Sequence, residues 1–456
     1  MSIISMDMSI FKQDFECDIG NKERFGEVST DFVLVNRILD LLPESLFLNP
    51  DLKWLDPCAG KGYFPIQLYI RLFDSLRTVI KEPEKRHQHI IEEMIYMIEL
   101  NPEHIPLLFE LFGENANIMS GDFLGMTNMK FDIIIGNPPF NMNGIKKAPT
   151  NRTKSKKSDG ISIWTNFLSN SVNNLKSKGY LAMITPSIWL KRDYGFHSYL
   201  LERGEMVKMR CMTNTETNRI FHKQAQTPTV YFAFHNDISR AGMINMYDLN
   251  IDEYVSCNTL KSIPLTSPNI IKRINTYVEK VGSLKVIKTS MRVGYKGLTV
   301  TTGEKTATHP YNNITTCILY GLEPRLVINQ SNIPCSFKGV EKLVMAHKMY
   351  GFPYYDKIGE YGISNRDNYV ITDYTSRELV MIKKFLETKL ALAIFESTRY
   401  RMTYLERYAF EFIPDITKLN DFPKEINDDT LNLYFGLTEQ EKSYVQNVSN
   451  RDYLYF

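Results

Sequence analysis

The sequence has few cysteines, and they lie far apart. Its 456 residues include 6 cysteines, namely Cys17, Cys58, Cys211, Cys257, Cys317 and Cys335. No two of them have the short spacing of zinc ligands, and together they do not form the framework of a disulfide-rich secreted domain. We therefore expect reduced thiols and no metal site.

Long apolar runs and a large excess of either charge are also absent. No run reaches the roughly 20 residues that cross a bilayer, and Met1 to Ile10 lacks the basic start of a signal peptide. We expect a cytoplasmic protein with no membrane partner, long enough for two or three domains. The net charge is only +2, so the total charge does not indicate a nucleic-acid partner.

The charge is unevenly distributed, however. Residues 285–410 contain 18 basic and 11 acidic residues, whereas residues 411–456 contain 4 basic and 9 acidic ones. Residues 144–160 contain six basic residues and one aspartate. Such a run is either a solvated face or a loop that becomes ordered on a phosphate backbone.

The most informative motif is a proline turn that ends an apolar run. The run 131–136 predicts a buried strand, and it is followed by Asn137, Pro138, Pro139 and Phe140. Proline fixes φ and has no backbone N–H, so the turn presents acceptors with few competing donors. An amide oxygen beside a free carbonyl oxygen can accept both hydrogens of an exocyclic amino group. The alternative is an ordinary strand-ending turn.

A glycine-containing turn lies upstream, between Asp56 and Gly62. A short apolar stretch precedes it, and a predicted helix over 65–75 follows it. Glycines spaced in this way let the backbone approach a ligand closely. The pattern is neither the dinucleotide-binding G-x-G-x-x-G motif nor a P-loop, so a dinucleotide or phosphate site is less favoured.

Two further acids are predicted to end strands between these motifs. Glu99 ends an apolar strand over 94–99, and Asp122 follows a strand that ends near 120. A carboxylate at the carboxyl end of a strand can accept the hydroxyls of a ribose. The distance from Asp56 to Glu99 exceeds the usual spacing of about 20 residues, because a charged helical stretch over 81–93 is inserted. Three strand-end acids followed by the proline turn predict one site along a sheet edge.

In this order, the motifs resemble those of S-adenosylmethionine-dependent amino methyltransferases, chiefly the gamma group of adenine-N6 DNA methyltransferases. The resemblance covers about residues 22–240. It implies an α/β, Rossmann-like methyltransferase domain over 1–240, with S-adenosylmethionine as cofactor. Because such a domain does not read a DNA sequence alone, we expect 241–456 to be a target-recognition domain of mixed α+β structure with a helical C-terminal part.

The resemblance also implies roles for individual residues in binding the cofactor. The glycine turn would lie against the methionine half, Glu99 would accept the ribose hydroxyls, and Asp122 and Phe123 would hold the adenine ring. In this family a threonine-proline pair closes over the methionine carboxylate, but here Asp31 follows Thr30 in place of the proline. The implied cofactor-binding residues are Thr30, Asp56, Pro57, Cys58, Ala59, Gly60, Gly62, Glu99, Asp122, Phe123 and Asn137.

The implied chemistry follows from the electronic structure of adenine. The N6 lone pair is conjugated with the ring, so the planar amino group is a poor nucleophile. Acceptance of its two hydrogens by the Asn137 side chain and the Pro138 carbonyl favours a pyramidal nitrogen, and no strong base is needed. The adenine must be flipped out of the duplex, where Phe140 would stack on it. The implied catalytic residues are Asn137, Pro138, Pro139 and Phe140.

Periodicity predicts the remaining elements. Ser29 or Thr30 is expected to cap a helix that contains Val33 and Leu34. An amphipathic helix over 161–175 is expected to bury Trp164, Phe167, Leu168 and Val172. Buried strands over 179–186 and 229–234 follow, and they resemble the strands of parallel sheets. Short strands dominate 285–375, and one helix is expected over 378–398.

Basic and aromatic residues interleave at 348–355, which suits DNA binding, although a core of tyrosine and phenylalanine is the alternative. The candidate DNA contacts are Lys146, Lys147, Lys154, Lys156, Lys157, Arg292, Lys296, Lys348 and Arg399.

Several other functions remain open. The pocket chemistry does not distinguish RNA adenine from DNA adenine. Protein glutamine methylation uses a similar motif, usually ending in tyrosine and in more compact enzymes, and N4-cytosine methylation usually shows Ser-Pro-Pro-Tyr. An inert DNA-binding subunit would bind DNA without transferring a methyl group. The implied partners are double-stranded DNA and, in a restriction-modification system, a separate restriction endonuclease.

Overall fold

The computed structural model describes residues 30–448, except 143–161, 193, 223–224, 226, 239–241, 259–260, 290–296, 366–367 and 401–404. The chain divides into two compact units. Unit 1 comprises Met1–Tyr247 and Ser256–Lys261, and unit 2 comprises Asp248–Val255 and Ser262–Phe456. Unit 1 extends past residue 240 because β8 (Met243–Asp248) pairs in parallel with β6 (Glu205–Met212).

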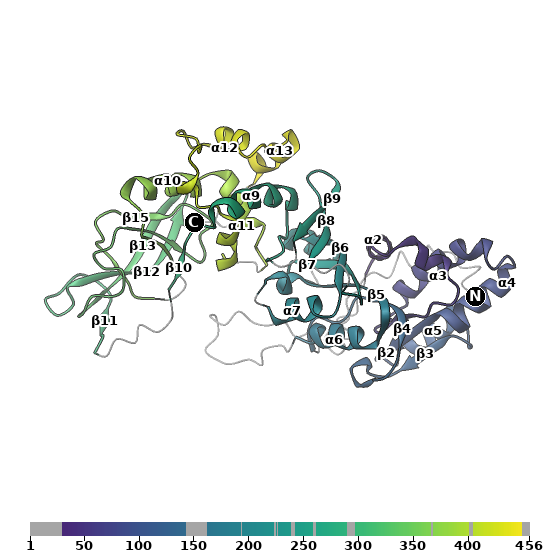
Figure 1. The fold of residues 1–456 in the computed structure, drawn as a ribbon. Helices are drawn as coiled ribbons and strands as arrows, with labels where there is room; N and C mark the ends of the chain where they lie inside the picture. The colour runs from purple at the N-terminus through teal and green to yellow at the C-terminus, as the bar shows by residue number, and fades with distance from the viewer. Residues whose placement is uncertain are drawn as a thin grey trace. The chain divides into compact units, whose positions relative to one another are not determined.

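Unit 1 is built on a nine-stranded sheet of order β3-β2-β1-β4-β5-β7-β6-β8-β9 (Figure 1). The strands not yet given are β1 (Trp54–Asp56), β2 (Ile95–Glu99), β3 (Asn117–Ser120), β4 (Phe131–Gly136), β5 (Leu175–Pro186), β7 (Thr229–His235) and β9 (Glu253–Asn258). β3, β2, β1, β4 and β5 are parallel. This is the predicted α/β, Rossmann-like architecture.

β7 differs from the sequence prediction in direction. It runs antiparallel to both β5 and β6, although its apolar run was predicted to be typical of a parallel strand. Six of its seven residues are buried. A strand that is buried on both faces has a continuous apolar run whether it is parallel or antiparallel to its neighbours. The pattern therefore indicates burial and not strand direction.

The helices of unit 1 connect these strands. They are α2 (Phe32–Leu39), α3 (Tyr63–Ser75), α4 (Pro83–His89), α5 (His104–Phe112), α6 (Trp164–Asn174), α7 (Gly195–Leu201) and α8 (Asn214–Ile220). α6 confirms the predicted amphipathic helix, since Trp164, Phe167 and Leu168 are buried. The inserted stretch is α4, which continues as a π-helical turn over Ile90–Met94.

The cap of α2 was predicted wrongly. Asp31, and not Ser29 or Thr30, is the N-cap, and its Oδ1 accepts a hydrogen bond of 2.6 Å from the N–H of Leu34. Aspartate is as good an N-cap as serine. Val33, expected on the apolar side, is 60% exposed. Thr30 therefore lies just before the helix, where its side chain is available for other contacts.

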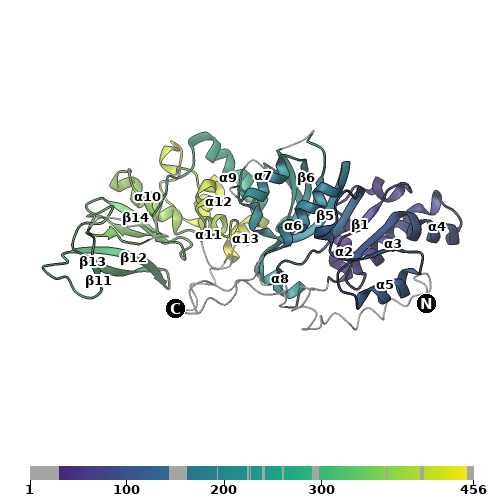
Figure 2. The same cartoon turned by 90° about the horizontal axis from the view of Figure 1, so that it is seen from below.

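Unit 2 contains two four-stranded sheets (Figures 1 and 2). One has the order β10-β17-β14-β15 and the other β11-β13-β12-β16. Their strands are β10 (Ile287–Lys288), β11 (Val300–Thr301), β12 (Tyr311–Tyr320), β13 (Glu323–Ser331), β14 (Lys342–Ala346), β15 (Tyr354–Asp356), β16 (Gly362–Ile363) and β17 (Asn368–Ile371). The short strands expected over 285–375 are thus present in the described part of that range.

The helices of unit 2 are α9 (Pro268–Val281), α10 (Ser376–Leu386), α11 (Lys389–Glu396), α12 (Asp428–Tyr434) and α13 (Glu439–Asn447). The single helix predicted over 378–398 is in fact two helices. Thr388 separates them because its side chain accepts a hydrogen bond from the N–H of Ala391 and so begins a new helix. Among the described residues, no helix is both long and apolar enough to span a membrane.

Candidate active site

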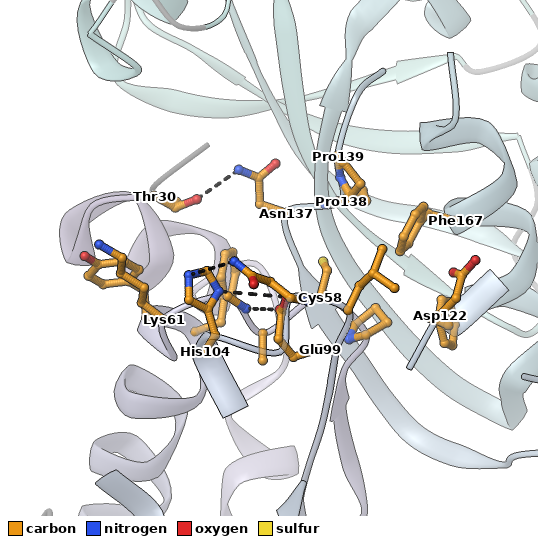
Figure 3. A pocket seen from close by; sticks show the side chains of 18 of the residues that line it. Thr30, Cys58, Lys61, Glu99, His104, Asp122, Asn137, Pro138, Pro139 and Phe167 are labelled. Carbon is orange, nitrogen blue, oxygen red and sulfur yellow. Dashed lines mark hydrogen bonds and ion pairs between the residues drawn. The ribbon is translucent and has the colours of Figure 1, made fainter. Parts of the chain in front are cut away.

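The predicted motifs meet at one edge of the sheet of unit 1. β3, β2, β1 and β4 are adjacent and parallel, so their carboxyl ends lie side by side. A pocket opens there (Figure 3). The predicted residues that line it are Thr30, Pro57, Cys58, Ala59, Gly60, Glu99, Asp122, Phe123, Asn137, Pro138, Pro139 and Phe140.

Two of the predicted cofactor-binding residues, Asp56 and Gly62, are not among the lining residues. Asp56 is 3% exposed, and its Oδ1 accepts a hydrogen bond of 3.0 Å from the N–H of Cys58. Burial raises the pKa of this carboxyl to about 7. Gly136 has φ 155°, and a Cβ there would lie 3.0 Å from Asp56 Oδ1. Asp56 therefore accepts a hydrogen bond from the backbone of the glycine turn, and glycine at position 136 leaves room for its carboxyl group.

Glu99 fastens the glycine turn to the end of β2. Its Oε2 accepts from the N–H of Gly60 and its Oε1 from the N–H of Asn101, each at 2.6 Å. The side chain is mostly buried, and burial raises the pKa of its carboxyl although these backbone bonds oppose the shift. A carboxylate oxygen can accept more than one hydrogen bond, so both oxygens retain capacity for a ligand in the pocket.

His104 lies beside this carboxylate at the start of α5. Its Nδ1 is 3.8 Å from Oε1 of Glu99, and its Nε2 is 3.4 Å from Nδ2 of Asn101. Burial and the neighbouring Lys61 lower the pKa of His104. The imidazole is therefore neutral near pH 7, and Lys61 is the charged basic group at this side of the pocket.

Cys58 connects the glycine turn to the proline turn. Burial, followed by the nearby carboxylates of Asp56 and Glu99, raises the pKa of its thiol. The thiol forms hydrogen bonds with the Asp56 side chain and with the backbone N–H of Asn137. A thiol that stays protonated is a poor nucleophile, so Cys58 holds the two turns together and does not react.

The amide of Asn137 has a defined orientation. Its Nδ2 donates a hydrogen bond of 2.9 Å to Oγ1 of Thr30, which is 4% exposed (Figure 3). Because the amide is planar, this bond also fixes the direction of Oδ1. Pro138 is buried, whereas Pro139 and Phe140 are half-buried. The turn thus presents an oriented amide at the pocket.

The opposite side of the pocket is acidic and aromatic. Asp122 is exposed, and its Oδ1 accepts a hydrogen bond of 2.9 Å from the N–H of Leu124. The Phe123 ring is buried, and its centroid lies 5.9 Å from that of Phe167 on α6. Figure 3 shows Asp122 and Phe167 on one side of the pocket and Lys61 on the other.

Residues 54–221 match the family model described as Eco57I restriction-modification methylase. This segment is therefore similar to an Eco57I-type methylase domain. All the motifs from the glycine turn to the proline turn lie within it. Thr30, which orients Asn137, lies before the matched segment.

The chain is also similar to curated proteins named as methylases or methyltransferases. One is an uncharacterized adenine-specific methylase of Mycoplasma pneumoniae, 26% identical over 252 residues, which are 38% of this chain and 57% of that protein. Another is the type II methyltransferase M.AccI of Acinetobacter calcoaceticus, 28% identical over 268 residues, 56% of this chain and 45% of that one. The chain spans about half the length of these relatives.

The solved structures that resemble this chain share little sequence identity with it and have low TM-scores. The type I restriction enzyme EcoKI M protein is 18% identical, with a TM-score of 0.38 over 49% of this chain and 49% of that one. The type ISP restriction-modification enzyme LlaBIII is 15% identical, with a TM-score of 0.36 over 50% of this chain and 20% of that one. The strand order of unit 1 itself carries the fold assignment.

The pocket includes residues to which the sequence motifs gave no role. Lys61, Asn101, His104 and Phe167 all line it. Lys61 lies inside the glycine motif, and Asn101 lies two positions after the strand-end acid Glu99. Both positions could have indicated a place in the pocket. Nothing in the sequence marked His104. The helical periodicity predicted that Phe167 is buried, but it did not predict which element or ligand Phe167 contacts.

The candidate DNA contacts are only partly within the described residues. Lys146, Lys147, Lys154, Lys156, Lys157, Arg292 and Lys296 lie outside them. Lys348 is exposed. Arg399 pairs with Glu396 at 2.9 Å, and its guanidinium lies 4.6 Å from the ring centroid of Tyr350. Because Tyr350 is fully buried, the interleaved segment contributes this ring to the core of unit 2 and not to an aromatic surface. Among the described residues there is no cluster of metal ligands.

Proposed function

We propose that this chain is a site-specific DNA methyltransferase that transfers a methyl group from S-adenosylmethionine to N6 of adenine in duplex DNA. The observation that carries the proposal is that the oriented amide of Asn137 faces the same pocket as the strand-end acids Glu99 and Asp122. The name of the similar Mycoplasma pneumoniae protein, an adenine-specific methylase, supports the choice of adenine. We further propose that the protein acts in the cytoplasm, and that a separate restriction endonuclease is its functional partner.

The donor set of the pocket fits this cofactor. Glu99 supplies carboxylate oxygens for ribose hydroxyls, and exposed Asp122 supplies an acceptor for an amino group on adenine. Phe123 and Phe167 supply aromatic faces for the ring. When bound, the cofactor supplies an electrophilic methyl group on a sulfonium. A Cβ at Gly60 would meet no atom within 4 Å, so the glycine turn leaves room on that side.

The proline turn activates the target amino group. Oδ1 of Asn137 accepts one N6 hydrogen and the carbonyl of Pro138 accepts the other, which localises the nitrogen lone pair. Thr30 holds Nδ2 of Asn137, so that the oxygen and not the nitrogen meets the amino group. Alignment of two reactants in one site removes much of the entropic barrier. The methylated amino nitrogen is strongly acidic, so its extra proton is released to solvent without a dedicated base.

The target base has to leave the DNA duplex to reach this pocket. Phe140, half-buried at the end of the proline turn, is positioned to stack on the flipped adenine. We assign recognition of the site to residues 241–456, with Lys348 as the exposed candidate there. The lysines of 144–160 are the candidates for phosphate contacts, which position the duplex without reading its sequence.

Transfer of tritium from labelled S-adenosylmethionine to DNA, RNA and protein, measured in parallel, tests the proposal. We expect label in duplex DNA, as N6-methyladenine, and none with the variant Asn137→Ala. Label in RNA or in a protein glutamine would replace the proposal with the corresponding alternative. Tight DNA binding with no transfer to any of the three would identify an inert DNA-binding subunit.

A further inference from the structure

Lys61 is a basic residue in the pocket to which the sequence motifs gave no role. It follows Gly60 in the glycine turn, is half-buried, and lines the pocket. Within the described part of the chain, no carboxylate lies within ion-pair distance of its ammonium group. A partly buried cation without an anionic partner is poised to bind an anionic ligand group.

The other pocket residues place the two ends of the cofactor. Under the proposed function, Asp122 and Phe123 hold the adenine ring and Glu99 holds the ribose. Figure 3 shows Lys61 on the far side of Glu99 from Asp122. An extended cofactor whose adenine lies at Asp122 therefore directs its amino-acid end toward Lys61. That end carries the only carboxylate of the molecule.

The element that closes over this carboxylate in the related enzymes is altered here. The hydroxyl of Thr30 accepts the hydrogen bond from Asn137. The next residue, Asp31, is an acid, and it is used as the N-cap of α2. An additional carboxylate near Thr30 would be repelled by Asp31 unless a cation were close. His104 is neutral near pH 7, so among the described lining residues Lys61 is the cation available for this purpose.

We propose that Lys61 binds the carboxylate of the methionine half of S-adenosylmethionine, and that the pocket thereby distinguishes the cofactor from its decarboxylated form. The proposal rests on the proposed function, because it takes that cofactor as the ligand. It concerns one ligand group only. A probe that lacks this carboxylate but keeps the sulfonium and the amino group therefore isolates the interaction.

Calorimetric titration of the full chain with S-adenosylmethionine and with decarboxylated S-adenosylmethionine tests the proposal. Lys61→Ala is expected to weaken binding of S-adenosylmethionine about tenfold or more, as loss of a charge-assisted hydrogen bond does. Binding of the decarboxylated form should stay the same, which also shows that the pocket is intact. Lys61→Arg should retain most of the affinity. Lys85→Ala, at an exposed site on α4, is the matched control and should change neither affinity.

Three results would overturn the proposal. If Lys61→Ala loses affinity for both ligands equally, Lys61 supports the turn and does not bind the carboxylate. If the variant binds S-adenosylmethionine as the wild type does, the carboxylate is held elsewhere, while the proposed function stands. If the wild type binds neither ligand, the proposed function fails and this inference fails with it.

Discussion

Replacement of Thr30 by valine tests whether orientation of the Asn137 amide governs the chemical step. Valine has the shape of threonine but cannot accept a hydrogen bond, so the 2.9 Å bond from Nδ2 of Asn137 is lost. The amide is then free to rotate and to present its N–H groups to the substrate amino group, which is also a donor. Molecules in that orientation cannot activate N6.

The size of the effect follows from the cost of an unpaired amide. A buried N–H without a partner costs about 1–3 kcal/mol. Thr30 is buried, but Asn137 is half-exposed, so water can partly replace the lost acceptor. We therefore expect the lower part of this range, and a fall in kcat of about 5- to 30-fold, since the correctly oriented population decreases by the same factor.

Single-turnover rates and cofactor affinity are measured on Thr30→Val, Thr30→Ser and the control Thr78→Val. Serine keeps the hydroxyl and should restore most of the rate. Thr78 is exposed and is not among the residues that line the pocket. The reasoning is refuted if Thr30→Val keeps the wild-type rate. It is also refuted if that variant loses only cofactor affinity, which would make Thr30 a cofactor contact.

Three further predictions concern the same edge of the sheet. Asn137→Ala should abolish methyl transfer while cofactor affinity, measured by equilibrium binding, stays within a few-fold, because the amide acts in the transition state; appreciable turnover would exclude the proposed role. Glu99→Ala should weaken cofactor binding by about 1.5–3 kcal/mol. Burial raises the pKa of Glu99. On acidification, the wild-type protein should therefore lose cofactor affinity at a higher pH than it would if Glu99 had an ordinary pKa. For Asp56, the carboxyl pKa is raised from 3.8 to about 7, so the folded state binds more protons and stability should fall as pH rises between these values, by up to about 4 kcal/mol. The melting temperature of Asp56→Asn should lack this decrease, and an equal decrease in the variant would contradict the assignment.

The sequence by itself determined the elements that carry the motifs and their common location. Apolar runs that end in Asp56, Glu99 and the Asn137 turn were predicted to be strands, and β1, β2 and β4 confirm them. Consecutive parallel strands joined by helices have their carboxyl ends at one edge of a sheet. A local pattern therefore sufficed to bring these residues together, because each motif is fixed to the end of its own strand.

Only the tertiary structure decided the contacts between distant parts of the chain. The partners Thr30 and Asn137 are 107 positions apart, and neither local sequence indicates the other. Periodicity predicted that Phe167 is buried, but the packing of α6 decides that it lies at the pocket. Likewise, Asp56 was predicted to bind the cofactor, and only the structure shows that its side chain is buried and is not among the residues that line the pocket. Burial follows from the local order of polar and apolar residues, whereas the identity of a neighbour depends on how separate elements pack, which no single segment encodes.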